Sequence, residues 1–394
     1  MAKKLQFNAF FESFHGLFME KKSVDLSHIE VTNTQVSLIL KATNEIKSKF
    51  GNKEIRALNG KELEYAKSIL RGVNDKLQKT GIKVVDIKKR GVEKGVKVKL
   101  HDGKEYMLKG LNEYFHEQKP QSPIYSCLYN QHEEKMIGQA NRSYLREYVS
   151  LKLSNLIHNG ISPNVKLGKI IINNENKSYY QYILFSEILG QDNGDKFCTL
   201  DECNGKNRQK ELGKISKQMW QDAFAISVGL LNDCDIGKPD NIGIIINVIQ
   251  NTIKVCLLDL AYQSIDKVGL DTKTFLPEFP TKEVDFFSLP KKANVSFINV
   301  PEKRLKWKFK VNENFKNRLD SADRAKALKW LVDQKGVIMK HLDDIAQEFG
   351  KNSEGIKIVK KMKDEIINRT SYLEKILNEH EKIQQENKNV LKAA

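Results

Sequence analysis

Apolar positions recur along the chain with two spacings, which separate helix-forming from strand-forming stretches. Through residues 1–80 apolar side chains lie three and four positions apart, most clearly from Phe7 to Phe18, and this predicts amphipathic helices. After Gly81 the alternation shortens to two in residues 82–87, 96–100 and 105–109, which predicts three short strands. The start of the chain is therefore expected to be helical and the stretch after it a sheet.

The remainder of the chain repeats both patterns. A helix is predicted at about residues 140–158, strands at 165–172 and 179–185, and a further helix that ends near Leu230. The segment from about 190 to 208 is polar and carries no predicted element, and several prolines make the chain irregular after Asp259. Helical spacing returns in residues 322–349 and 356–383.

Composition adds a strong positive charge to this picture. The 394 residues carry a formal net charge of +16, which favours polyanionic partners such as nucleic acid, anionic membranes or phosphorylated small molecules. A lysine-rich protein from an AT-rich genome would show the same excess, so the charge alone does not choose a partner. No recognised nucleic-acid reading motif is present, and nucleic acid is not an expected partner.

Cysteine usage and the N-terminal sequence indicate an intracellular protein. The five cysteines are scattered, and Cys198 and Cys203 lack the second pair or nearby histidine that would complete a zinc site. We expect them to be reduced thiols. No apolar run of about 18 residues and no signal-peptide pattern is visible.

The most informative stretch runs from Asn232 to Gly243 and is followed, after a second apolar strand, by Asp259. Asp235, Asn241 and Asp259 give an acid, an amide and a second acid around a strand–turn–strand. Metal-assisted phosphoryl transfer needs one carboxylate to orient the attacking hydroxyl, and oxygen ligands that hold Mg²⁺ against nucleotide phosphates. The pattern predicts a divergent kinase.

The order of these elements resembles the protein kinase superfamily, and its atypical HipA-like and phosphoinositide 3/4-kinase-like branches in particular. The likeness rests on the strand Tyr106–Lys109, the helix segment Leu145–Leu153 and its exit Asn159–Val165, and it covers about residues 81–265. Effector kinases of intracellular bacterial pathogens such as Legionella are similar in joining a reduced kinase core to foreign flanks. The resemblance implies an α+β, two-lobed kinase-like fold with residues 1–80 as a helical extension, 81–190 as the N lobe, 191–300 as the C lobe and 301–394 as a basic helical module.

The resemblance also implies roles for individual residues. Lys109 would contact the α and β phosphates of ATP, and Glu147 would orient it. Glu187 and Leu189 would belong to the hinge that meets the adenine. Asp235 would position the substrate hydroxyl, whereas Asn241 and Asp259 would bind Mg²⁺ or Mn²⁺. The extra residue between Asp235 and Asn241 leaves Asp233 and Asp240 as alternatives, and Lys238 would stand in for the usual basic residue near the catalytic acid.

Two groups of basic residues suggest further ligands. One group, in a loop and at the start of the Glu147 helix, would suit a polyanion such as inositol hexakisphosphate that activates the kinase: Lys88, Lys89, Arg90, Lys94, Arg142 and Arg146. A second group lies on the last helices, beside Trp307 and Trp330, and would suit a phosphoinositide membrane: Lys357, Lys360, Lys361, Lys363 and Arg369. The alternatives left open are a solvated basic face and a plain helical extension.

The expected function is transfer of the γ-phosphate of ATP to a protein hydroxyl. For an effector, the protein would act in the host cytosol or at a cytosolic membrane surface. A phosphoinositide kinase is the alternative within the same chemistry. The alternative outside it is a non-catalytic pseudokinase adaptor that binds anionic membrane.

Overall fold

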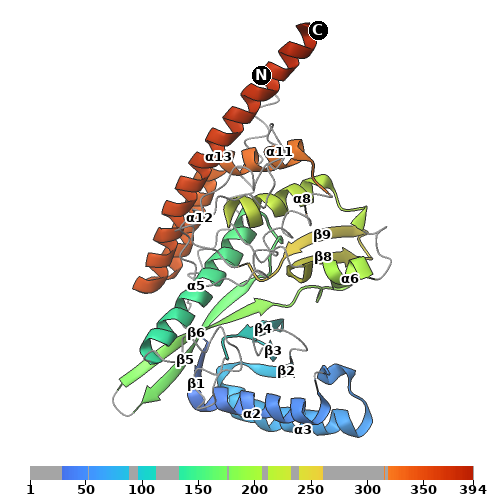
Figure 1. The fold of residues 1–394 in the computed structure, drawn as a ribbon. Helices are drawn as coiled ribbons and strands as arrows, with labels where there is room; N and C mark the ends of the chain where they lie inside the picture. Colours follow the sequence, from blue (N-terminus) through green and yellow to red (C-terminus); the bar gives the residue numbers. More distant parts are fainter. Residues whose placement is uncertain are drawn as a thin grey trace, which may run out of the picture.

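A six-stranded sheet and a helical lobe make up the computed structural model, which describes residues 29–51, 53–87, 96–111, 133–174, 177–205, 212–231, 239–260, 315 and 318–393 (Figure 1). The strand order is β1-β5-β6-β4-β3-β2, and only β1 and β5 run parallel. The strands are β1 (Glu30–Thr32), β2 (Lys83–Ile87), β3 (Val96–Lys99), β4 (Glu105–Lys109), β5 (Val165–Asn174) and β6 (Lys177–Glu187). The five strands predicted here from alternation are all present.

Two helices from the N-terminal part of the chain cover one face of this sheet. They are α2 (Asn33–Phe50) and α3 (Gly60–Leu77), and their buried apolar residues share a core with β2, β3 and β4. The sequence left open whether this part packs on the sheet, and the structure shows that it does. Strand β1 was missed, because three residues are too few to show alternation and Thr32 already forms the capping box of α2 with Gln35.

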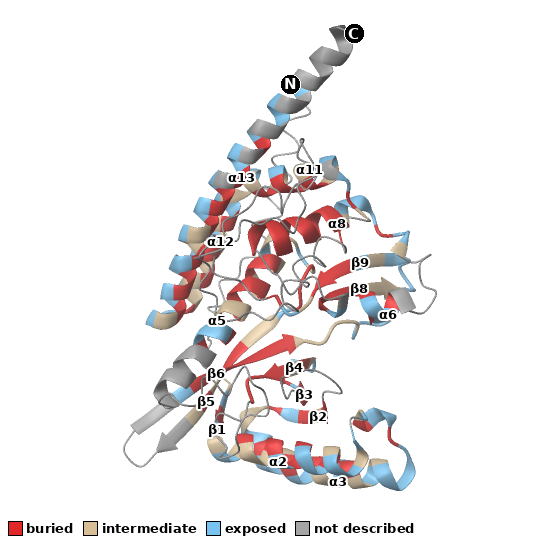
Figure 2. Ribbon diagram, in the orientation of Figure 1, coloured by how far each residue is buried: buried red, intermediate tan, exposed pale blue. Residues whose placement is uncertain are grey.

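The sheet separates two hydrophobic cores, because successive side chains of a strand point to opposite faces. Along β6, Ile183 and Phe185 belong to the core shared with α2 and α3. Tyr182 and Leu184 belong to the core of the helical lobe. Figure 2 shows the resulting band of buried residues along β6. The expected two-lobed α+β architecture is therefore confirmed, with one strand contributing to both lobes.

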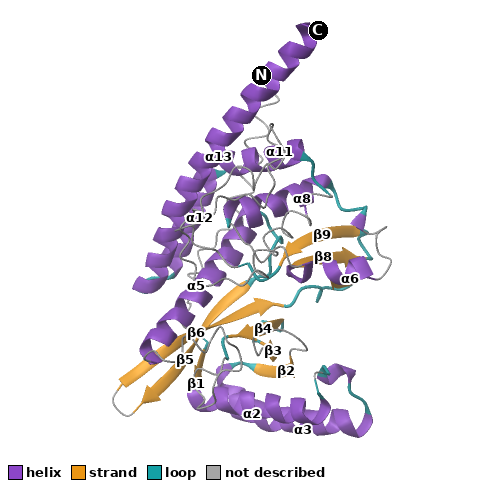
Figure 3. Ribbon diagram, viewed as in Figure 1, coloured by secondary structure: helices purple, strands orange, loops and turns teal. Residues whose placement is uncertain are grey.

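The helical lobe is built on α5, which runs from the sheet into its centre (Figure 3). Its helices are α5 (Glu133–Ile157), α6 (Leu200–Gly205), α8 (Lys217–Phe224) with its π-helical continuation η4 (Ala225–Leu230), α11 (Ser321–Asp333), α12 (Lys335–Glu348) and α13 (Ser353–Ala393). The predicted helix at 322–349 is in fact two helices, divided at Gln334. Among the described residues, no helix is long and apolar enough to cross a bilayer.

A small second sheet, in the order β7-β8-β9, lies in the helical lobe. It contains β7 (Asp195–Thr199), β8 (Ile242–Asn247) and β9 (Thr252–Leu257). Strand β7 falls in the polar segment to which no element was assigned, and it was missed because Cys198 is the one buried residue in it, so the strand shows no alternation. The expectation of reduced thiols was wrong for Cys198 and Cys203. These two residues form a disulfide that links β7 to α6.

Candidate active site

Lys109 is the meeting point of three segments that are distant in sequence. It is the last residue of β4, where it pairs with Leu184 of β6, and the neighbouring strand β3 pairs with β4 as far as Leu108. Its Nζ donates a hydrogen bond to Glu147 Oε1 at 2.6 Å and a second to Asp259 Oδ1. The Lys109 and Glu147 side chains are only 10% and 15% exposed, whereas that of Asp259 is 49% exposed. One cation is thus held between a buried and an accessible carboxylate.

Helix α5 delivers Glu147, and a buried asparagine fixes that helix to the sheet. Asn141 Oδ1 accepts a hydrogen bond from the Tyr182 amide at 2.7 Å, and its Nδ2 donates to the Tyr180 carbonyl at 3.1 Å. Both groups belong to β6, beyond the last residue pair that β6 forms with β4. The side chain therefore supplies hydrogen bonds to β6 beyond the point where its pairing with β4 ends. Asn141 was missed from sequence, where an Asn in a helix gives no signal of this pairing.

Asn241 and Asp259 lie side by side because they flank the same hairpin. Ile242 at the start of β8 pairs with Leu257 at the end of β9, and the Leu258 amide donates to the Asn241 carbonyl at 2.7 Å. Asp259 has a φ of +50°, a conformation that non-glycine residues adopt at a cost of about 1–3 kcal/mol and that is concentrated at functional sites. The hairpin places Asn241 and Asp259 at the same end of its two strands, and Asp259 contacts Lys109.

The donor set at this edge suits a hard divalent cation. Mg²⁺ and Mn²⁺ take oxygen ligands from Asp and Asn, and in kinase-like sites they use few protein ligands with nucleotide phosphates supplying the rest. Asp259 Oδ1 faces Lys109, and half of the Asp259 side chain is accessible, so it can offer an oxygen to solvent. Among the described residues, no three His, Cys, Asp or Glu side chains form a metal-binding cluster.

The expected hinge residues are largely occupied by internal bonds. The Glu187 carboxylate accepts from Lys104 Nζ and from Asn164 Nδ2, each at 2.6 Å. The Ile188 amide donates to the Glu105 carbonyl at 2.9 Å. The Glu187 side chain therefore fastens the end of β6, while Leu189 is half-buried just beyond the strand. Sequence reasoning missed Gln191, whose amide bonds both backbone groups of Glu105.

Several predicted site residues lie outside the described residues. Asp235, its alternative Asp233 and Lys238 belong to residues 232–238, and the four loop cations of the polyanion group belong to residues 88–95: Lys88, Lys89, Arg90 and Lys94. Asp240, the other alternative, is described and is exposed. The structure thus brings together Lys109, Glu147 and Asp259 from the predicted set, and Asn241 lies at the start of the hairpin that leads to Asp259.

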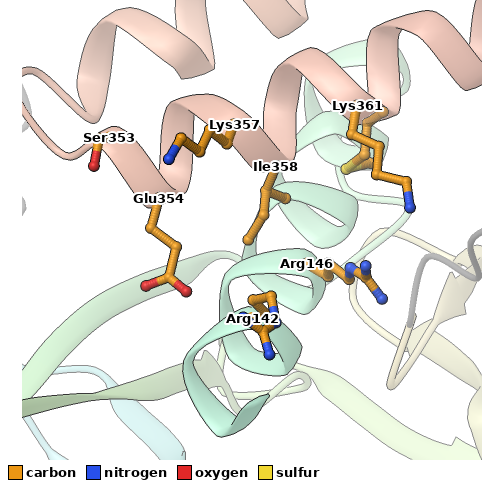
Figure 4. Close-up of a pocket in the computed structure, with 8 residues that line it drawn as sticks. Arg142, Arg146, Ser353, Glu354, Lys357, Ile358 and Lys361 are labelled. Atoms are coloured by element: carbon orange, nitrogen blue, oxygen red, sulfur yellow. The ribbon is translucent and has the colours of Figure 1, made fainter. Parts of the chain in front are cut away.

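A basic pocket of about 440 Å³ lies between α5 and the first turns of α13 (Figure 4). Arg142 and Arg146 line it from α5, and Lys357 and Lys361 line it from α13, together with one carboxylate, Glu354. Burial raises the pKa of Glu354, and the nearby Arg142 and Lys357 act in the opposite direction. Sequence reasoning assigned the two arginines and the two lysines to different ligands, because their helices are about 200 residues apart in sequence.

The basic residues of the last helices that were expected to bind a membrane do not form one surface. Arg369 is buried and donates from Nη1 to the Leu230 carbonyl at 2.5 Å, so it is not part of a surface. Lys363 pairs with Asp343 at 2.6 Å, and Trp330 packs against the core of the helical lobe. Trp307 lies outside the described residues.

Comparison with known proteins found likenesses among solved structures. No family model matches this chain, and no curated protein matches it. Among solved structures, the chain is similar to the Rio2 kinase from Chaetomium thermophilum in its complex with ADP/Mg²⁺ and phosphoaspartate. The identity is 12%, the match covers 86% of this chain and 97% of that chain, and the TM-score is 0.33.

Proposed function

We propose that this protein is a Mg²⁺- or Mn²⁺-dependent atypical kinase that transfers the γ-phosphate of ATP to a protein hydroxyl. One observation supports it above the others: Lys109 lies between Glu147 and Asp259, on a strand, a helix and a hairpin respectively. A lysine oriented by a helix carboxylate, beside an acid that can hold metal, is the arrangement that protein kinases use to bind and align nucleotide phosphates. The resemblance to effector kinases adds the expectation that the acceptor is a host protein.

In this proposal each residue has a defined task. Lys109 binds the α and β phosphates, and Glu147 keeps its ammonium group directed into the site. Asp259 and Asn241 hold the metal, which neutralises charge on the transferred phosphoryl group when bound. Asp235 accepts the proton of the attacking hydroxyl. Because Lys109 contacts both carboxylates in the structure, nucleotide binding exchanges its contact with Asp259 for contacts with phosphate.

The direct test is transfer of labelled phosphate from ATP with Mg²⁺ or Mn²⁺, to a protein acceptor and, in a parallel assay, to phosphoinositide vesicles. Asp259→Asn is expected to lower kcat/KM by about 100-fold or more, since it removes the negative charge from one of the two proposed metal ligands. Asp201→Asn, at an exposed position on α6, is the matched control and is expected to retain full activity. Activity that survives Asp259→Asn would overturn the proposal.

The parallel acceptors distinguish the alternatives. Label that appears in lipid but not in protein would favour a phosphoinositide kinase built on the same site. Absence of label with every acceptor, together with no thermal shift on adding ATP, would favour the non-catalytic adaptor. Flotation with phosphoinositide vesicles then tests membrane binding through the remaining exposed lysines of α13, such as Lys360.

The basic pocket supports a second part of the proposal, activation by a polyphosphorylated ligand such as inositol hexakisphosphate. Four cations against one carboxylate line its walls, and α5, which carries two of them, also carries Glu147. The amides of Glu354 and Gly355 at the start of α13 donate to Asn352 Oδ1, so an anion would be held by side chains. A ligand that bridges α5 and α13 would oppose the repulsion between their cations and hold α5 in place.

Titration with inositol hexakisphosphate tests this part separately. The double variant Arg142→Gln, Lys357→Gln is expected to weaken binding at least tenfold, because each lost charge-assisted contact contributes about 1.5–3 kcal/mol. Arg71→Gln with Lys79→Gln, both at exposed positions near α3, is the charge-matched control. Equal weakening in both would show that only the net charge matters, and activity that does not depend on the polyphosphate would refute activation.

A further inference from the structure

The turn between α12 and α13 contacts the helix that carries Glu147. Glu348, at the end of α12, accepts hydrogen bonds at Oε2 from Tyr148 OH at 3.2 Å and from Lys152 Nζ. Tyr148 is the residue after Glu147, and Lys152 lies one turn further along α5. One carboxylate from the C-terminal helices therefore engages two side chains of α5, directly beside the residue that pairs with Lys109.

Packing around Glu348 makes this contact specific. Tyr148 is 1% exposed, and its ring meets that of Phe349 edge to face with 5.9 Å between centroids. Burial, followed by the nearby Glu348 carboxylate, raises the pKa of the Tyr148 hydroxyl, which therefore remains a proton donor. Lys152 and Glu348 are 19% and 21% exposed, so solvent screens their ion pair less than it screens a surface pair.

The same turn is also tied to the sheet. Asn352 Nδ2 bonds the hydroxyl of Tyr182 on β6, and Asn352 Oδ1 caps the first turn of α13. Residues Glu348–Asn352 thus lie against α5 and against β6, the strand to which Asn141 fastens α5. The turn therefore contacts both elements whose packing places Glu147.

We propose that Glu348 is a positioning residue, which acts through α5 to keep Glu147 on Lys109. This inference rests on the proposed kinase function. The pairing of Glu147 with Lys109 at 2.6 Å tolerates little movement, since a displacement of α5 by about 1 Å would carry the carboxylate beyond hydrogen-bond distance. The C-terminal helices are then part of the machinery that aligns phosphate, as well as a site for other ligands.

The test compares Glu348→Gln and Tyr148→Phe with the control Glu381→Gln, which breaks the exposed ion pair between Lys329 and Glu381 on the same helical layer. The first readout does not require activity: the rate at which an amine-reactive acylating reagent labels Lys109, followed by mass spectrometry. Glu348→Gln is expected to raise this rate at least fivefold, because Lys109 is released from Glu147, and Glu381→Gln is expected to leave it unchanged.

A double-mutant cycle separates positioning from a general loss of packing. In a Glu147→Gln background, Glu348→Gln is expected to change the labelling of Lys109 less than twofold, because the partner through which it acts is already altered. In the wild-type background it is expected to lower kcat about tenfold, with a smaller change in KM for the protein acceptor.

Three outcomes would overturn the inference. They are unchanged labelling of Lys109 in Glu348→Gln, an equal effect in both backgrounds, or an equal effect in Glu381→Gln. If wild-type protein transfers no phosphate, the proposed function fails, whereas the labelling cycle still decides whether Glu348 acts through Glu147. Tyr148→Phe keeps the ring and the carboxylate, so a labelling effect there assigns part of the coupling to the hydroxyl.

Discussion

Replacing Asn141 by alanine would test whether the attachment of α5 to the sheet controls the site. The substitution removes two hydrogen bonds to β6 and leaves the Tyr182 amide and the Tyr180 carbonyl without these partners. Asn141 is buried, so water replaces its amide poorly. Asn74 provides a matched comparison, because its side chain bonds both backbone groups of Val84 on β2, at 2.8 and 3.0 Å, and it lies on a helix that carries no site residue.

The expected costs follow from burial. Each unsatisfied buried group costs about 1–3 kcal/mol, so Asn141→Ala, which leaves two such groups, is expected to lower the free energy of unfolding by about 2–6 kcal/mol. Asn74 is only half-buried and β2 is an edge strand, so water can reach the groups that its removal exposes. For Asn74→Ala we expect about 1–2 kcal/mol.

Urea denaturation measures the two stabilities, and phosphate transfer at a temperature where both variants are folded measures activity. Asn141→Ala is expected to lose at least tenfold in kcat, because α5 no longer holds Glu147 against Lys109. Asn74→Ala is expected to keep activity within about twofold of wild type, because the helix that carries Asn74 contributes no residue to the proposed mechanism. Equal activities in the two folded variants would refute the reasoning that the Asn141 contacts orient the site.

Three further predictions concern single positions. Gly110 has a φ of +93°, which strains any other residue, so Gly110→Ala is expected to lower the free energy of unfolding in urea by about 1–2 kcal/mol. Because Gly110 directly follows Lys109, the substitution is also expected to lower activity. The hydrogen bond with Asp222 raises the pKa of His158, so this pair is expected to stabilise the fold below about pH 6.5 and to lose the effect as pH rises. Asp222→Asn should flatten the pH dependence of the urea midpoint. The hydrogen bond from Arg56 is the main cause that lowers the pKa of Glu54 to about 2. The ionised Glu54 is therefore expected to stabilise the fold above about pH 4.5, and this stabilisation is lost as the pH falls towards 2. Glu54→Gln should abolish that loss in urea midpoints.

Strands and long helices were predictable here because their signals are local. The alternation in residues 105–109 and the helical spacing before Leu230 report burial on one face of a single element, which one stretch of sequence contains. The hairpin that joins Asn241 to Asp259 was predictable for the same reason, since its strands are adjacent in the chain. The short strand β1 was not, because what stabilises it is its pairing with β5, more than 130 residues away.

The contacts that complete the site could not be predicted, because they join residues whose roles depend on three-dimensional position. Lys109 and Asp259 are 150 residues apart, and only the likeness to a kinase suggested that they meet. No such likeness covers Glu348, which in sequence is one more charged residue on an amphipathic helix, and whose partners lie about 200 residues earlier. A charged residue on a helix normally faces solvent, so a sequence pattern cannot separate it from a carboxylate held by a buried tyrosine. If Glu348 orients α5, the C-terminal helices take part in the mechanism although they lie outside the part of the sequence that resembles a kinase. Removing the residues beyond 315 would then abolish activity even with every residue that contacts ATP in place.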